Sequence, residues 1–286
     1  MANPVFNNSP VFQDPVQRRG QKSPASTVSY GTAGAATTDA ATLDTLYNAP
    51  SATTRDTGRL TYDDVIIRTG GLLALLVVIA AGSWYLTPSM PWILWVGMLA
   101  GLVLGLVNAF RKEPSPPLII AYTAAQGLFL GGISYLFQNY VVEGTSTGTA
   151  APIVTQAVIA TLATFAGALF LFRSGKVRVT PKFTRWLLIG LVGYLIFSLA
   201  NFVASFFLAS DGFGPFRNGI WGVLAGLVGV GLAAASLIVD FDAIKRGVDK
   251  GAPAKFAWSA AFGLIVTLVW LYLEFLRLFA ILQGRN

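Results

Sequence analysis

The chain has 286 residues, of which 54% are apolar and 12% are charged, about half the charged share of an average soluble protein. Its net charge of +7 does not indicate a nucleic-acid partner, because the basic residues lie between apolar stretches. The absence of cysteine and histidine excludes disulfides, thiolate sites, the usual zinc sites and Ser-His-Asp chemistry. Proton or metal chemistry must therefore use carboxylates. An enzyme is the least expected class, and no cofactor is expected.

Residues 1–60 form the first segment in chain order, rich in Ser, Thr, Ala, Asn, Gly and Pro and without a sustained hydrophobic period. Such a segment buries too little apolar surface to offset its ordering entropy. We therefore predict a disordered cytoplasmic tail over residues 1–60 and one membrane domain over residues 61–286. A small repeat, "NPVF" and "SPVF", is either compositional drift or a docking motif.

Seven apolar runs follow the tail, each near or above the ~20 residues that a helix needs to cross a bilayer. Lipid offers no hydrogen bonds to the backbone, so these runs are expected to be helices. The sequence predicts an all-α membrane protein with seven transmembrane helices over these runs: Val65–Leu86, Pro91–Phe110, Pro117–Phe137, Pro152–Phe172, Trp186–Leu208, Gly219–Val239 and Phe256–Leu282.

Basic residues set the expected orientation. If the helices alternate, 17 of the 20 Lys and Arg residues fall on the side that holds the N-terminal tail. By the positive-inside rule that side is cytoplasmic, and the C-terminus lies outside. The opposite connections hold only Arg217 and the terminal Arg285.

Small residues recur every four positions in two runs, at Gly97, Gly101 and Gly105 and at Gly222 and Gly226. This spacing leaves bare backbone along one helix face and permits close helix packing. The pattern predicts packing and carries no functional content of its own.

Few ionisable residues lie at membrane depth. Each of them can be explained either by a structural role or by a function. Asp240 and Asp242 could be interfacial residues, since four basic residues follow them. Arg111 could be a positive-inside anchor. A carboxylate at mid-bilayer costs about 2.5–3.5 kcal/mol, so Glu274 more strongly indicates a functional role. Its local partner could be Arg277, three residues on, unless that arginine extends toward the headgroups.

Three stretches resemble the transmembrane Bax-inhibitor-motif family, in particular its bacterial members. They are "FRKEPSPPLIIAYTAAQGLFLGGIS" (110–134), "LIVDFDAIKRG" (237–247) and "LVWLYLEFLRLFAIL" (268–282). The seven-helix layout agrees over about residues 60–286, whereas the tail lies outside the resemblance. The resemblance implies a bundle with a central last helix in a bacterial cell membrane, and a calcium leak sensitive to pH.

The resemblance also implies roles for individual residues. Asp240 matches an acid of the sixth helix and Glu274 an acid of the seventh, and these two share a proton in the pore. Together they would form the proton site and a weak calcium site. Arg111 matches an arginine that helps hold the pore closed, as a gate or latch. Asp242 is an accessory acid without a certain counterpart.

Two departures bear on the shared proton. Relatives with a paired aspartate site have Asp where this chain has Glu274. In addition, with a turn near 247–251, Asp240 and Glu274 differ in depth by nearly 20 Å at ~1.5 Å per residue. They meet only if part of residues 251–262 lies along the interface or bends back before the last helix begins.

Two function classes follow. If the two acids meet, they cannot both ionise cheaply and would hold a common proton, and weak calcium binding suits conduction. The partners are then the lipid bilayer, calcium ions and protons. The alternative is a non-conducting regulator that binds membrane proteins such as quality-control proteases. A proton-coupled transporter lacks the expected inverted repeat.

Overall fold

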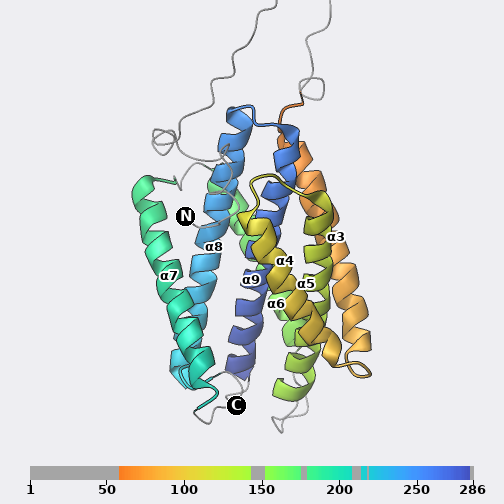
Figure 1. The fold of residues 1–286 in the computed structure, drawn as a ribbon. Coiled ribbons are helices and arrows are strands. Elements are labelled where there is room, and N and C mark those ends of the chain that lie inside the picture. Colours follow the sequence, from red (N-terminus) through yellow and green to blue (C-terminus); the bar gives the residue numbers. More distant parts are fainter. Residues whose placement is uncertain (1–57, 143–151, 175–178, 208–213, 218, 284–286) are drawn as a thin grey trace, which may run out of the picture.

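Seven helices long and apolar enough to cross a membrane make up the described part of the chain (Figure 1). The computed structural model describes residues 58–142, 152–174, 179–207, 214–217 and 219–283. No β-strand occurs among them, which confirms the all-α prediction. The helices are α3 (Tyr62–Leu86), α4 (Trp92–Phe110), α5 (Pro116–Leu136), α6 (Ile153–Arg173), α7 (Pro181–Ala204), α8 (Gly219–Asp249) and α9 (Ala257–Gln283).

Local sequence signals account for several helix ends. Thr61 caps α3 in a capping box, in which the Thr61 hydroxyl accepts from the Asp64 N–H at 3.1 Å and the Asp64 carboxylate accepts from the Thr61 N–H at 3.2 Å. Pro116 and Pro181 stand in the first turns of α5 and α7, where a missing N–H costs nothing. A π-helix, η2 (Phe137–Val142), continues α5 and was not predicted.

The connection from α8 to α9 is short and turns on a glycine. Gly251 has φ of 62°, the left-handed region that glycine enters at little cost. The Ala252 N–H donates to the Gly247 carbonyl at 3.0 Å, which satisfies the end of α8. A single 3₁₀ turn, η3 (Ala254–Phe256), then leads directly into α9 at Ala257. The last helix is therefore one continuous α-helix with an early start.

The last residues of the predicted tail, 58–60, belong to the described part of the chain. Leu60 is buried and its N–H donates to the Ala252 carbonyl at 2.6 Å. The Ala254 N–H donates to the Gly58 carbonyl at 2.8 Å. Residues 58–60 therefore pack against the α8–α9 connection. Residues 1–57, with the small repeat, lie outside the described residues.

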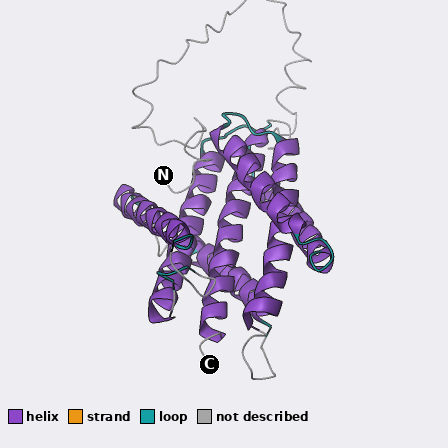
Figure 2. Cartoon of the chain, turned by 60° about the horizontal axis from the view of Figure 1, so that its bottom comes forward, coloured by secondary structure: helices purple, strands orange, loops and turns teal. Residues whose placement is uncertain are grey.

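Helix α9 runs through the middle of the bundle, as expected of the last helix. It packs against α3, α5, α6 and α8 and has the largest buried share of the seven candidate spans. By contrast, α7 packs chiefly against α8 and lies at the edge of the bundle (Figure 1). Figure 2 shows the same helices from another side, with the described loops at their ends.

Both predicted glycine faces lie in close helix contacts. A Cβ added at Gly97 would lie 2.6 Å from the Phe129 backbone nitrogen, so α4 lies directly on the α5 backbone. On α8, a Cβ at Gly226 would lie 3.1 Å from a methyl of Leu278 in α9. The glycines thus permit the close approach that the spacing indicated.

The basic connections meet at one end of the bundle. Lys255 of η3 forms an ion pair with Glu113, in the α4–α5 connection, at 3.0 Å. Arg68 of α3 donates to the Ala254 carbonyl at 2.6 Å. At the other end, Gln283 near the end of α9 donates to Gln156 near the start of α6 at 2.9 Å. The helices therefore alternate in direction as the sequence predicted.

Candidate functional site

Two carboxylates are buried where α8 meets α9. The first, Asp240 of α8, is fully buried and accepts a hydrogen bond from the Thr267 hydroxyl of α9 at 2.7 Å. The same hydroxyl lies 3.2 Å from the Gly263 carbonyl. Because a threonine hydroxyl has one proton to donate, we take the shorter contact with Asp240 as the dominant one. Thr267 is thus the α9 residue that faces Asp240.

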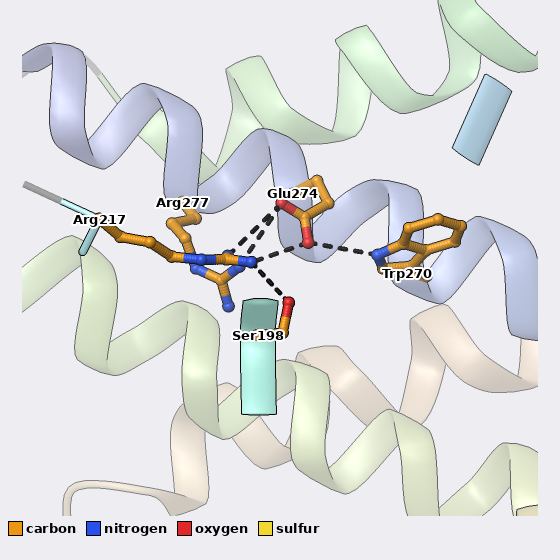
Figure 3. A network of polar contacts seen from close by, with 5 residues as sticks. All are labelled: Ser198, Arg217, Trp270, Glu274 and Arg277. Carbon is orange, nitrogen blue, oxygen red and sulfur yellow. Dashed lines mark hydrogen bonds and ion pairs between the residues drawn. The ribbon is translucent and has the colours of Figure 1, made fainter. Parts of the chain in front are cut away.

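The second carboxylate, Glu274, lies among donors and cations (Figure 3). It accepts from the Trp270 indole N–H at 3.2 Å. Arg277 donates to both carboxylate oxygens at 3.3 and 3.4 Å, so the expected local pair is present. Arg217 lies 3.9 Å away as a second ion-pair partner. One carboxylate therefore faces two guanidinium groups.

Arg217 lies in the α7–α8 connection, where sequence reasoning counted it only as a loop charge, but its side chain reaches into the bundle. Its side chain is only 3% exposed. It donates to the Ser198 hydroxyl of α7 at 2.8 Å. Its guanidinium also lies 5.1 Å from the ring centre of Tyr194 and 5.3 Å from that of Phe197, within cation–π range. Arg217 therefore links α7 to Glu274 on α9.

Gly229 of α8 makes room for this cluster. A Cβ at this position would lie 2.8 Å from the Glu274 Oε2 and 2.5 Å from the Tyr194 hydroxyl oxygen. Any larger residue would have to displace one of these groups. The close α8–α9 contact thus seats the Glu274 carboxylate beside bare backbone.

The hydrogen bonds and ion pairs given above do not join Asp240 to Glu274: Asp240 faces Thr267, whereas Glu274 faces Arg217 and Arg277. Asp240 stands nine residues before the end of α8 at Asp249, and Thr267 stands ten after the start of α9 at Ala257, so these two reach the same depth. Glu274 is seven residues further along α9, about 10 Å at the helical rise. The early start of α9 keeps Glu274 at a different depth from Asp240.

The weak calcium site expected from Asp240 and Glu274 stays a prediction. Among the described residues, no group of three or more His, Cys, Asp or Glu residues could hold a metal ion. Asp240 and Glu274 occupy separate surroundings, one with a hydroxyl donor and one with two arginines. A divalent cation bound by both would have to bridge two carboxylates that stand about 10 Å apart in depth.

The two remaining predicted residues lie at the basic end. Asp242, the accessory acid, is half-buried and forms an ion pair with Arg246 at 3.0 Å, one turn on in α8. Arg111, the expected gate or latch, caps the C-terminus of α4 and is exposed. Within the described residues, no hydrogen bond or ion pair joins Arg111 to Asp240 or Glu274.

A cavity of about 790 Å³ adjoins Glu274. Helix α7 lines one side of it, and α5 and α9 line the other. Its polar lining includes Ser198, Asn201, Arg217, Glu274 and Arg277. Asn201 also accepts from the Phe216 N–H at 3.0 Å, which ties the segment before α8 to α7.

Sequence reasoning missed Arg217, Tyr194, Trp270 and Thr267 as parts of the site. One signal was available for Arg217, because it is the only basic residue in the α7–α8 connection. Trp270 stands four residues before Glu274, a spacing that places both on one helix face. The partners on α7 carried no such signal, because that contact depends on the tertiary arrangement.

A comparison with curated proteins finds no significant match. A family model described as Bax inhibitor 1 like matches residues 3–284. The match includes the N-terminal segment that the sequence resemblance had left out. Since it extends over nearly the whole chain, and the described residues form seven membrane-length helices around a central α9, this integral membrane protein belongs to the Bax inhibitor 1 like family.

Proposed function

We propose that the protein is a proton-regulated calcium leak in a bacterial cell membrane, with Asp240 on α8 and Glu274 on α9 as two separate carboxylate positions. The observation that carries the proposal is the burial of both acids where α8 meets α9. Ionisable groups inside membrane helices are costly and usually mark an ion or proton path. The family membership supports the same class of activity.

The separate positions of Asp240 and Glu274 change how protonation would control the leak. If the two carboxylates shared one proton, neutralising either of them would remove the whole pH dependence of the leak. Separate positions instead give two contributions, each set by its own surroundings. Asp240 offers a carboxylate beside a hydroxyl, whereas Glu274 is held by Arg217 and Arg277. Protonation of Glu274 would weaken its hold on both arginines and so alter the α7–α9 contact.

The test is calcium flux into vesicles across a pH series. We expect Asp240→Asn and Glu274→Gln each to remove part of the pH dependence, and the double variant to remove all of it. Asp242→Asn is the matched control, because that half-buried acid lies two residues from Asp240 and pairs with Arg246. Its pH profile should follow the wild type.

Three outcomes would count against this proposal in different ways. Complete loss of pH dependence in either single variant would restore the shared-proton model. Unchanged profiles in both single variants would exclude both acids as the sensor. A wild-type protein that passes no calcium at any pH would instead favour the non-conducting regulator, which binds membrane proteins such as quality-control proteases. Deletion of residues 1–55 should impair such a regulator and spare a leak.

A further inference from the structure

The cavity beside Glu274 is continuous with the surface that would face lipid. Within the described residues, α7 packs chiefly against α8, so no close helix packing closes the wall between α7 and α5. Leu195 and Phe202 of α7 line the cavity and are 67% and 60% exposed. Because these residues lie on a membrane-spanning helix, the surroundings that reach the cavity are the bilayer itself.

The lining divides into an apolar part and a charged part. Phe129 and Ile133 of α5 face Leu191 and Leu195 of α7 across the apolar part. The acidic and basic side chains of the lining are Arg217, Arg277 and Glu274, so even with Glu274 ionised the lining carries a net charge of +1. A ligand that fills this cavity should be amphipathic and carry a net negative charge.

The contacts with Glu274 do not use all the hydrogen-bond donors of the two arginines, so a further anion can bind to them. Charge-assisted hydrogen bonds between a guanidinium and a carboxylate are usually ~2.7–2.9 Å long. Arg277 reaches Glu274 only at 3.3 and 3.4 Å, through one nitrogen, and Arg217 stays at 3.9 Å. Figure 3 shows both guanidinium groups converging on the one carboxylate.

The two arginines differ in exposure, so they differ in how readily they can contact a ligand in the cavity. Arg217 is 3% exposed, and its Nε makes no hydrogen bond to the described residues. Arg277 is 31% exposed and lines the cavity, so it can reach a bound anion. Two like charges beside one carboxylate repel each other, and a second anion would offset that repulsion.

We propose that this cavity binds an anionic phospholipid, with the phosphate at Arg277 and an acyl chain along Leu191 and Leu195. The cavity volume of about 790 Å³ falls within the range of small-molecule sites and suits part of a lipid. A zwitterionic lipid would bring a further cation beside the two arginines, so a net anionic headgroup is preferred. This site does not depend on whether the protein conducts calcium.

The experiment uses the natural absence of cysteine. Leu191→Cys, labelled with bimane in detergent micelles, reports on the cavity when phosphatidylglycerol with brominated chains is added. Ile189→Cys is the matched control, because Ile189 is on the same helix, 63% exposed and outside the lining. We expect saturable quenching at position 191 and only weak, non-saturable quenching at position 189.

Two comparisons test the proposal: the quenching by an anionic and a zwitterionic lipid, and the effect of removing the charge of Arg277. Brominated phosphatidylcholine should quench position 191 about tenfold less effectively than phosphatidylglycerol, the scale of one charge-assisted contact. Adding Arg277→Gln should weaken phosphatidylglycerol quenching about tenfold, whereas Arg277→Lys should keep most of it. Thermal unfolding of both variants shows whether the fold is retained.

Three results would overturn the proposal. Equal quenching by the two lipids would show that the cavity takes any acyl chain. Full quenching in a folded Arg277→Gln variant would remove the arginine from the site. Displacement of the lipid by millimolar inorganic phosphate would show a site for the phosphate group alone.

Discussion

At the scale of single residues, Arg217 joins α7 to α9, because it contacts both Ser198 and Glu274. The side chains of Arg217 and Glu274 are nearly fully buried, at 3% and 4% exposed. Removing one member of a buried ion pair leaves the other charge without compensation, which typically costs about 3–5 kcal/mol. Here Arg277 still neutralises Glu274 in part, so the cost should lie at the lower end of that range.

We therefore predict that Arg217→Gln lowers the free energy of unfolding by about 3 kcal/mol. The double variant with Glu274→Gln should lose clearly less than the sum of the two single changes, with a coupling of about 0.5–3 kcal/mol. Chemical unfolding in detergent measures all three. Arg246→Gln is the control, because its pair with Asp242 is 31% and 20% exposed and should contribute at most about 1 kcal/mol. Additive losses would show that Arg217 and Glu274 do not interact.

At the scale of elements, bare backbone decides how α4 lies on α5. A Cβ at Gly97 would lie 2.6 Å from the Phe129 nitrogen and 2.8 Å from the Ala125 carbonyl oxygen. Backbone atoms of a packed helix cannot move aside as the end of a side chain can. Gly97→Ala should therefore cost about 1–3 kcal/mol of stability through overpacking.

A glycine-to-alanine substitution where the added methyl group meets no other atom should raise the stability of the protein instead of lowering it. Gly82 of α3 has nothing within 4 Å of an added Cβ, so Gly82→Ala should stabilise α3 by about 0.5–1 kcal/mol. Thermal unfolding of the two variants in one detergent compares them directly. Equal and small shifts would mean that α4 and α5 do not approach as closely as described.

The helices could be predicted from the sequence, because lipid requires long apolar runs and forces each one to satisfy its own backbone. The predicted run Phe256–Leu282 differs from α9 (Ala257–Gln283) by one residue at each end. The sequence did not predict equally well which residues of α8 and α9 lie opposite each other. That depends on the length of the α8–α9 connection, and ending α8 at Asp249 places Thr267, rather than Glu274, opposite Asp240.

Arg217 shows a second limit of sequence reasoning. A lone basic residue in a connection has the same appearance whether it faces water or reaches back into the bundle. Its partners Ser198 and Glu274 stand 19 and 57 residues away in the chain. Only the packing of α7 beside α8 and α9 brings the three together, and no local pattern records that packing.

At the scale of the whole molecule, the two ends of the bundle differ in charge. The start of α3, the α4–α5 connection and the α8–α9 connection meet at one end. That end carries most of the described basic loop residues, whereas Glu274 and the cavity lie toward the other end of α9. The positive-inside rule predicts that the basic end is cytoplasmic. The Arg217–Glu274 cluster then lies in the half of the membrane that faces outside.

Labelling of single cysteines tests this orientation without background, because the chain has none of its own. Ser89→Cys, in the α3–α4 connection, should react with a membrane-impermeant maleimide on intact cells. Lys112→Cys and Lys250→Cys, both exposed at the basic end, should react only after permeabilisation. The reverse pattern would place the lipid cavity in the cytoplasmic leaflet and Glu274 within reach of cytoplasmic protons. Under the proposed function, the orientation therefore decides which compartment's protons would reach Glu274.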